Sequence, residues 1–312
     1  MTSKVVNQSS KKNELTLSAN LEQLIESSMS DNTASSYRLA LRQFADWSNK
    51  GRAINDATCA EYVAFIYESG RAVATAKMFA ASMNKLAGQS DQPTPIGALT
   101  KSAISGFARQ ARGRGRGQAV GIGWESSDFI ATLAAKSDTL SGLRNAAIIS
   151  VMSDGLLRVS ELSNLTVNDF QMQADGSGRL TISHSKTDQE GLGATVYLGQ
   201  PTAKLIQSWL AVSGISDGAL FRSISKGQKV GESKLSRQSI SALLKQAAAS
   251  AGIDSIRGHS LRVGSAQSLA TRGASLVAMQ QAGRWSDPTM PSHYAKAQLA
   301  ARGAVAKLRY GA

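Results

Sequence analysis

The sequence predicts a mostly α-helical protein with a small β-sheet, divided into two domains. Apolar residues recur at helical spacing over residues 16–110 and again over much of residues 125–312. An Arg/Gly-rich stretch, residues 111–124, separates these two regions. Only one pair of segments, RLTISHS and ATVYLG, is β-like, and polar residues join the two as in a hairpin. A chain of 312 residues is long enough for each region to bury a core of its own.

Four helices are expected in the first region. The residues before it, 1–15, are polar and are expected to be disordered. In the first helix Tyr37 and Phe44 lie on one apolar face, with Thr33 as the N-terminal cap and Gly51 as the stop. Further helices are expected near residues 56–70, 74–87 and 96–110. Short turns between these segments predict a small helical bundle.

Residues 111–124, ARGRGRGQAVGIGW, are predicted to link the two domains. Alternating arginine and glycine cannot sustain a core or a regular element, because glycine leaves the backbone free. Arg112, Arg114 and Arg116 could follow a phosphate backbone across this segment. The alternative is a linker whose arginines serve only to keep it soluble.

The second domain, residues 125–312, is expected to combine the hairpin with many helices. These helices are expected near residues 127–136, 142–153, 202–213, 236–251 and 259–271. Two short helices should surround Trp285 and Tyr294, and an amphipathic helix, residues 303–310, should close the chain. One hairpin among so many helices predicts a mostly α domain.

The charge of the chain favours a polyanionic partner. The formal net charge is +13 and the isoelectric point is near 10.0. Residues 1–117 carry a net charge of +6 and the remainder +7, as expected if both domains bind the same nucleic acid. The alternative is a basic but otherwise ordinary soluble protein.

The cellular compartment can also be inferred from composition. Cys59 is the only cysteine, so no intramolecular disulfide can form, and this suits a reducing compartment. The N-terminal residues lack the apolar segment of a secretory signal. No stretch approaches the roughly 20 apolar residues that span a bilayer. The expectation is a soluble cytoplasmic protein without a membrane partner.

Six residues of the second domain supply the groups that a metal-free phosphodiester exchange needs. They are Arg158, Lys186, His259, Arg262, Trp285 and Tyr294. Two guanidiniums can each bind a phosphate through two hydrogen bonds. A lysine can protonate a leaving alkoxide, a histidine can move a proton, and an indole N–H can donate a hydrogen bond. A tyrosine hydroxyl can attack phosphorus and hold the phosphoryl group covalently.

The segments that contain these residues resemble the tyrosine recombinase (phage integrase) family, and most nearly its Cre-like members. They are GLLRVSEL, SHSKT, GHSLRVG and GRWSDPTMPSHY, and they follow the order of the family's motifs. The resemblance is close from about Asn145 to Tyr310. It implies a helical, SAM-like core-binding domain before a catalytic domain, with the two domains forming a C-shaped clamp on DNA. It also implies that the last helix can dock into a neighbouring subunit, although packing on its own domain is an equal alternative.

The resemblance implies a role for each residue. Arg158 and Arg262 would bind the scissile phosphate, with Glu161 supporting the site. His259 would accept a proton from the nucleophile or donate to the phosphate. Trp285 would donate to a phosphate oxygen; because indole N–H cannot accept, it cannot shuttle a proton.

The remaining two roles complete the reaction. Tyr294 would attack to give a 3′-phosphotyrosyl link, and Lys186 would protonate the leaving 5′ oxygen. The family exchanges strands through a Holliday junction as a homo-tetramer on two DNA sites, without a cofactor. Accessory proteins are possible but not implied, and a nucleoid-associated location follows from the DNA partner.

Less specific readings compete with these roles. Arg158 and Glu161 could be an ordinary ion pair on one helix face, Lys186 a solvated hairpin lysine, and Trp285 a core residue. Lys226 and Lys229 are the alternatives to Lys186 as the acid. The other tyrosines are poorer nucleophile candidates: Tyr37, Tyr62 and Tyr67 lie in apolar helical patterns, Tyr197 in a strand and Tyr310 almost at the terminus.

A metal or nucleotide site is not predicted. The three histidines, His184, His259 and His293, show no paired ligand spacing, and the single cysteine adds none. The segment GRGRGQAVGIG lacks the Gly-Lys-Ser/Thr ending of a phosphate-binding loop.

Two other functions and a set of base-reading residues remain as hypotheses. A type IB topoisomerase would use similar chemistry without exchanging strands, and a catalytically silent DNA-binding protein would keep only the basic surface. The residues expected to read bases lie at exposed positions of candidate recognition helices: Lys77, Asn84, Arg237, Gln238 and Ser241. The setting, whether integration, excision or resolution of mobile DNA, stays open.

Overall fold

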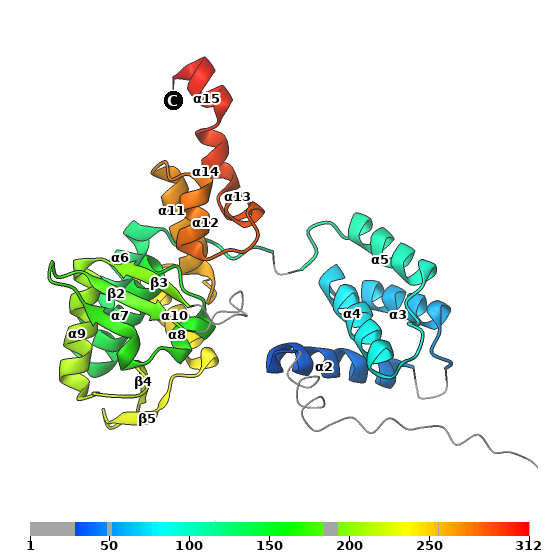
Figure 1. Cartoon of the computed structure of the whole chain (residues 1–312), viewed down its shortest axis with the longest axis horizontal. Helices are drawn as coiled ribbons and strands as arrows, with labels where there is room; N and C mark the ends of the chain where they lie inside the picture. The colour runs from blue at the N-terminus through cyan, green and yellow to red at the C-terminus, as the bar shows by residue number, and fades with distance from the viewer. Residues whose placement is uncertain (1–28, 49–51, 116, 184–192, 255, 312) are drawn as a thin grey trace, which may run out of the picture. The chain divides into compact units, whose positions relative to one another are not determined.

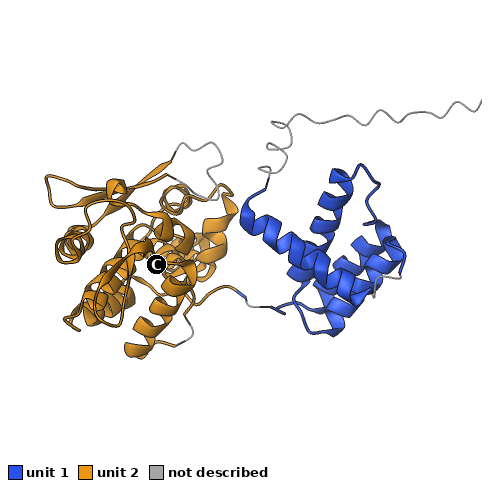
Figure 2. Cartoon of the chain, turned by 90° about the horizontal axis from the view of Figure 1, so that it is seen from below, with its two compact units in different colours: residues 1–117 blue, residues 118–312 orange. Residues whose placement is uncertain are grey.

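The computed structural model describes residues 29–48, 52–115, 117–183, 193–254 and 256–311 (Figure 1). It contains two compact units, Met1–Gly117 and Gln118–Ala312 (Figure 2). The segment 1–15, expected to be disordered, lies outside the described residues. Within the described part of the chain, no helix combines the length and apolar character needed to cross a bilayer.

Unit 1 is a bundle of helices around an aromatic core. Its described helices are α2 (Asp31–Trp47), α3 (Asp56–Glu68), α4 (Val73–Gln89) and α5 (Ala98–Gln110). The rings of Phe44, Tyr62 and Phe79 meet with centroids 4.8 to 5.1 Å apart, and each of the three is almost fully buried. The cap of α2 is Ser30, which accepts from the Thr33 N–H, and not Thr33 as predicted.

Asp56 joins two helices of unit 1. It lies in the first turn of α3, but its carboxylate accepts hydrogen bonds at 2.9 Å from the N–H groups of Gly97, Leu99 and Thr100 at the start of α5. The Thr100 hydroxyl donates a further hydrogen bond at 2.6 Å. The hydrogen bonds from Thr100, its hydroxyl first, lower the pKa of Asp56 to about 2. Asp56 therefore caps α5 from a neighbouring helix.

The predicted linker is held at both ends. The guanidinium of Arg114 stacks 4.6 Å from the Tyr67 ring centroid and donates to the Tyr67 carbonyl at 2.6 Å. At the other end Ile122 is buried, and its N–H donates to the Ser260 carbonyl at 3.0 Å. A side chain on Gly264 would lie 1.9 Å from the Ile122 carbonyl oxygen, so glycine is needed there. Composition alone did not indicate these attachments.

Unit 2 is mostly helical, with two small sheets. Its helices are α6 (Trp124–Ala135), α7 (Leu140–Asp154), α8 (Val159–Asn164), α9 (Gln200–Ser213), α10 (Arg237–Ser250), α11 (Ser260–Thr271), α12 (Leu276–Gly283), α13 (Thr289–Tyr294), α14 (Lys296–Ala301) and α15 (Ala304–Tyr310), with the 3₁₀ turn η1 (Val167–Asp169). Helix α7 is buried along almost its whole length and packs against α6, α9 and α11. The core of unit 2 therefore surrounds α7.

The β structure is larger than the single hairpin predicted. The predicted pair corresponds to β2 (Gly178–Ile182) and β3 (Ala194–Leu198), which are antiparallel with Leu180 opposite Val196. Strand β1 (Phe170–Met172) adds to β2, and β4 (Arg222–Ile224) pairs with β5 (Val230–Lys234) in a second sheet. Strands of three residues, such as β1 and β4, are too short to show a period of two, so the sequence pattern missed them.

The C-terminal helix α15 exposes apolar side chains. Val305 is 68% exposed, Leu308 88% and Tyr310 70%. In contrast, the preceding helix α14 packs against α11. The apolar face of α15 is thus not covered by the described residues of its own unit. This differs from the predicted alternative in which the last helix packs on its own domain.

We expect the substitution Asp56→Asn to destabilise the chain in a pH-dependent way. The folded-state pKa of about 2 lies below the ordinary value of 3.8. The carboxylate's contribution to the free energy of unfolding is therefore full above the ordinary pKa and is lost as pH falls through about 2. Melting curves by circular dichroism should show a lower Tm for the variant at neutral pH, and this difference should shrink under acid conditions.

A matched control is Asp91→Asn, which removes one carboxylate from an exposed turn of the same unit. Its Tm should follow that of the parent at every pH. A Tm difference for Asp56→Asn that did not change with pH would show that the charge of Asp56 is not what stabilises α5.

Candidate active site

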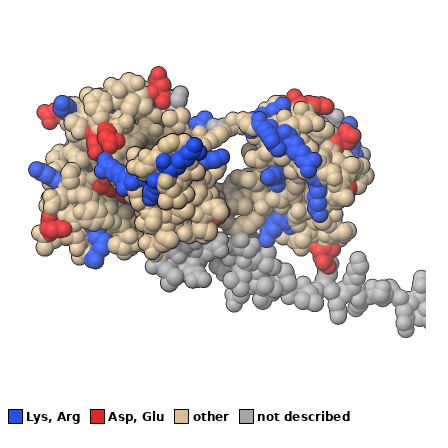
Figure 3. Space-filling view, turned by 90° about the horizontal axis from the view of Figure 1, so that it is seen from above, with Lys and Arg blue, Asp and Glu red and all other residues tan. Residues whose placement is uncertain are grey.

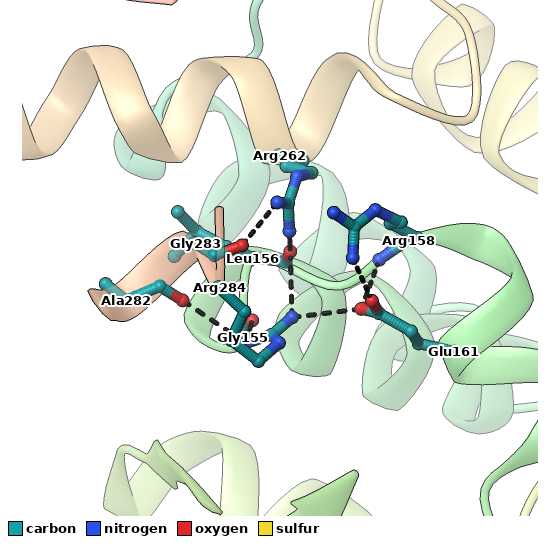
Figure 4. Close-up of polar contacts among 8 residues, drawn as sticks. All are labelled: Gly155, Leu156, Arg158, Glu161, Arg262, Ala282, Gly283 and Arg284. Carbon is teal, nitrogen blue, oxygen red and sulfur yellow. Dashed lines mark hydrogen bonds and ion pairs between the residues drawn. The ribbon is translucent and has the colours of Figure 1, made fainter. Parts of the chain in front are cut away.

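The candidate site forms where the turn after α7 meets the start of α11 and the end of α12 (Figure 4). Arg158 is the N-cap of α8, and Glu161 lies in the first turn of that helix. The Glu161 carboxylate accepts from the Arg158 N–H at 2.9 Å and pairs with the Arg158 guanidinium at 2.5 Å. The ion pair expected from their spacing is therefore present, but Arg158 is the cap residue before α8, and Glu161 reaches back to it as in a capping box.

Arg262 is the most deeply buried charged residue that the site uses. It lies in the first turn of α11 with 0% exposure. Its two terminal nitrogens donate to the carbonyls of Leu156 and Gly283, and its Nε has no partner among the described residues. Burial, followed by the nearby charge of Arg158, lowers the pKa of Arg262 to about 9. The guanidinium therefore remains charged at neutral pH.

Trp285 supports both Arg262 and Tyr294. Its ring lies 4.6 Å from the Arg262 guanidinium carbon and 5.5 Å from the Tyr294 ring centroid. The side chain is 6% exposed and belongs to a small core with Met279 and Leu156. This cation–π contact and the burial give Trp285 a packing role. Its donation to a phosphate oxygen stays a prediction.

His259 precedes α11 and has a suppressed affinity for protons. Its ring centroid lies 6.2 Å from that of Tyr294. Burial first, and then the charges of Arg262 and Arg158, lower the pKa of His259 below its ordinary value. The imidazole is therefore neutral at pH 7 and able to accept a proton. A side chain at Gly258, directly before His259, would lie 2.6 Å from Val159, so this glycine allows a close contact within the protein.

Tyr294 is the last residue of α13 and is half-buried. Its carbonyl accepts from Gln118 at 3.3 Å and from Gln267 at 3.4 Å, which fix the backbone at this point. Its ring lies near those of Trp285 and His259, while Tyr197 is 68% exposed on β3. The site thus brings Tyr294 together with five of the predicted residues: Arg158, Glu161, His259, Arg262 and Trp285.

Other predicted residues lie elsewhere. Lys186 and Arg116 fall outside the described residues. Four more belong to unit 1 and are all exposed: Arg112, Arg114, Lys77 and Asn84. Asn84 accepts a hydrogen bond from the Thr94 hydroxyl. Arg237 and Gln238 are exposed at the start of α10. Ser241, predicted as exposed, is half-buried because it packs against the turn at Gly258. Its hydroxyl donates a hydrogen bond to the Arg237 carbonyl at 2.9 Å.

The sequence interpretation missed Arg284. Its guanidinium pairs with Glu161 at 2.9 Å and donates to the Gly155 carbonyl at 2.9 Å, and its side chain is 10% exposed (Figure 4). Arg284 stands directly after α12 with φ 52°, a position that usually holds glycine. The sequence did offer one signal for this role, the arginine of GRW, which is a charged residue where a helix end usually has glycine.

The charges of the site suit a phosphodiester. The guanidiniums of Arg158, Arg262 and Arg284 surround one carboxylate, Glu161, which leaves a net charge of about +2 in a largely buried setting. Guanidiniums bind phosphate oxygens through charge-assisted pairs of hydrogen bonds. The arrangement therefore stabilises an anion.

Comparisons with known proteins agree with this chemistry. The model of the phage integrase family matches residues 126–300. Recombinase Cre of Escherichia phage P1 is 27% identical over 269 residues, covering 80% of this chain and 78% of that protein. An integrase/recombinase XerD homolog of Selenomonas ruminantium is 28% identical over 294 residues, covering 89% and 85%.

A similar fold is found among solved structures. The XerH site-specific recombinase bound to a palindromic difH substrate has a TM-score of 0.68 and 19% identity, covering 87% of this chain and 78% of that one. The predicted mostly helical class with a small β-sheet is confirmed, with two small sheets among the described residues instead of one. Because the family model spans more than half of the chain, the chain belongs to the phage integrase family and is a tyrosine-type site-specific DNA recombinase.

Proposed function

We propose that Tyr294 is the nucleophile with which this chain cuts and rejoins DNA in a site-specific exchange, as in integration, excision or resolution of mobile DNA. The observation that carries the proposal is the packing of Tyr294 against Trp285, whose ring also contacts the buried guanidinium of Arg262. A tyrosine at this place lies beside the groups that can bind a phosphate. Among the described residues, Tyr62 also packs against a tryptophan with an arginine over its ring, but that arginine, Arg52, is exposed, whereas Arg262 is buried.

The reaction balances without an external energy source or cofactor. The Tyr294 hydroxyl oxygen bonds to phosphorus, the bond to the 5′ oxygen breaks, and a 3′-phosphotyrosyl link results. His259, which is neutral at pH 7, takes the proton of the hydroxyl, and Lys186 gives a proton to the 5′ oxygen. The 5′-hydroxyl of a partner strand then attacks the phosphotyrosine and restores the diester, and two such rounds pass through a Holliday junction.

The arginines stabilise the charge that develops during attack. Arg158 and Arg262 bind the non-bridging oxygens, and their charge matters most when phosphorus is five-coordinate. Loss of one such donor costs on the order of 10²–10³ in rate. Trp285 adds an N–H donor and keeps Arg262 in place through the ring contact at 4.6 Å.

Duplex DNA is bound by both units. Figure 3 shows Lys and Arg side chains gathered over part of the visible face of each unit. The proposed limits are a core-binding domain over residues 16–110, a linker over residues 111–124 and a catalytic domain over residues 125–312, which together clamp the duplex. The proposed base-reading and backbone-binding residues are Lys77, Asn84, Arg112, Arg114, Arg116, Arg237, Gln238 and Ser241.

The active assembly is proposed to be a homo-tetramer on two DNA sites. The support for contacts between subunits is the uncovered apolar face of α15, with Val305, Leu308 and Tyr310. This helix would dock into a neighbouring subunit. A nucleoid-associated location in the cytoplasm follows from the DNA substrate, and accessory proteins are not required by this scheme.

Replacing Tyr294 with phenylalanine should abolish covalent capture of DNA. The test is a nicked suicide duplex carrying the chain's site, selected beforehand by binding from a randomised library, followed by a denaturing gel. The parent should form a protein–DNA adduct, and Tyr294→Phe should form none while binding the duplex as tightly. Tyr197→Phe, at an exposed strand position, is the matched control and should form the adduct normally.

An adduct formed by Tyr294→Phe would exclude this tyrosine as the nucleophile. With an intact pair of sites, the parent should also produce Holliday junctions. Relaxation of supercoiled DNA without any junction would instead indicate a topoisomerase.

Replacing Lys186 with alanine should slow cleavage of an ordinary duplex by about 10²–10³. A duplex with sulfur in place of the 5′ bridging oxygen should restore most of the rate, because a thiolate leaves without being protonated. Single-turnover cleavage of the two substrates measures this rescue. Lys226→Ala and Lys229→Ala are the controls, and rescue by sulfur in either of them, but not in Lys186→Ala, would move the acid to that residue.

The acidic limit of cleavage should lie below the ordinary pKa of histidine, 6.5. Burial and the neighbouring arginines lower the pKa of His259, so the imidazole remains able to accept a proton at mildly acidic pH. Single-turnover rates against pH would show this limb in the parent and not in His259→Gln. A parent limb above the ordinary value would contradict the neutral role of His259.

A further inference from the structure

Arg284 holds a backbone conformation that its side chain disfavours. Helix α12 ends at Gly283, and Arg284 follows with φ 52° and ψ 47°. In this left-handed region Cβ crowds the backbone, which is why helices commonly end here with glycine. A bulky residue keeps such a conformation where its surroundings determine it strongly. The contacts of the Arg284 side chain are therefore expected to hold this conformation.

The guanidinium of Arg284 joins three segments of the site. It donates to the Gly155 carbonyl at 2.9 Å and to the Leu156 carbonyl at 3.3 Å, in the turn that follows α7. It also pairs with the Glu161 carboxylate at 2.9 Å. Figure 4 shows Arg284 between this turn and Glu161, with Arg158 on the other side of the carboxylate. The end of α12 is thereby fixed to the segment that leads to Arg158.

The charge of Glu161 is shared between two arginines. Its side chain is 1% exposed, so water does little to stabilise its charge. If Arg284 were absent, more of the compensation of this buried carboxylate would come from Arg158. Arg158 would then be held more tightly by Glu161 and would present less net charge to an anion. With Arg284 present, the group of two guanidiniums and one carboxylate keeps a net charge of +1.

We propose that Arg284 is a positioning residue for strand cleavage. It compensates Glu161 and fixes the turn at residues 155–157, so that Arg158 meets the scissile phosphate with its charge and orientation preserved. The inference rests on the proposed function, since it concerns the rate of attack by Tyr294. Arg284 acts through Glu161 and the turn, whereas Arg262 is expected to touch the phosphate itself.

The protonation of Glu161 gives the proposal a specific signature. Burial raises the pKa of Glu161, but the charge of Arg284, followed by the N–H and the charge of Arg158, outweighs burial and lowers it overall. Among the described residues, the charged or titratable groups Arg262 and His259 at the start of α11 also lie near this carboxylate. Removing Arg284 therefore raises the pKa of Glu161, and protonation of Glu161 at mildly acidic pH would then release Arg158.

The substitution Arg284→Gly tests the inference without straining the backbone, because glycine adopts φ 52° readily. We expect its single-turnover adduct formation to fall by about 10- to 100-fold, which is the range typical of residues that orient the side chains bound to a metal ion. Its DNA affinity should change little, and the acidic limb of its rate should move to higher pH. Arg284→Lys, which keeps the charge, should recover part of the rate.

A cycle with Glu161→Gln tests the route of the effect. If Arg284 acts through Glu161, Arg284→Gly should slow the Glu161→Gln enzyme much less than it slows the parent, and it should not move the acidic limb. The matched control is Arg272→Gln, which removes an arginine from an exposed ion pair with Glu125 on the same unit. This control should cleave at the parent's rate.

Several results would overturn the inference. One is a parent-like rate and pH profile for Arg284→Gly, and another is an equal loss of rate with and without Glu161. A lower Tm together with a slower rate, an unmoved acidic limb and no recovery in Arg284→Lys would assign Arg284 a merely structural role. Should Arg284→Gly not fold, Arg284→Lys decides the question by its own pH profile. A parent that forms no adduct through Tyr294 would refute the proposed function instead.

Discussion

The structure of the site depends on one buried carboxylate, that of Glu161. It lies 1% exposed between the guanidiniums of Arg158 and Arg284 and also accepts from the Arg158 backbone N–H. A buried charge is costly unless it is paired and hydrogen-bonded, and here both conditions are met. Because α8 begins at this pair and the carbonyls of the turn after α7 accept hydrogen bonds from Arg284 and Arg262, the helices around the site are fixed relative to one another.

Packing and chemistry use the same residues in unit 2. Trp285 fills a small core, and its ring contacts both the Arg262 guanidinium and the Tyr294 ring. Gly283 leaves room for that ring, since a side chain there would lie 2.1 Å from it. A change that loosens this core would therefore also move Arg262, which is proposed to bind the phosphate, and the proposed nucleophile. The buried setting lowers the pKa of both His259 and Arg262, which links the fold to the proposed proton transfer.

Much of the fold and site could be predicted because the signals are local. The helices of both units follow from apolar spacing, and the predicted strands β2 and β3 were found. Five of the predicted site residues do lie near Tyr294. They could be identified from the sequence because their motifs are short and occur in order along the chain. Arg284 was missed because its partners, Gly155 and Glu161, are more than 120 residues away in sequence. The strand β1 was missed because three residues carry no period.

The sequence by itself determined the family, the mostly helical class and the identity of most candidate site residues, because these depend on residue type and short-range order. Only the tertiary structure decided how the charges are shared. It placed Arg158 at a helix start, buried Arg262 on the Trp285 ring, and brought Arg284 to Glu161 from a distant helix end. These features arise from packing between segments far apart in the chain, and the desolvation that sets each pKa exists only once those segments have come together.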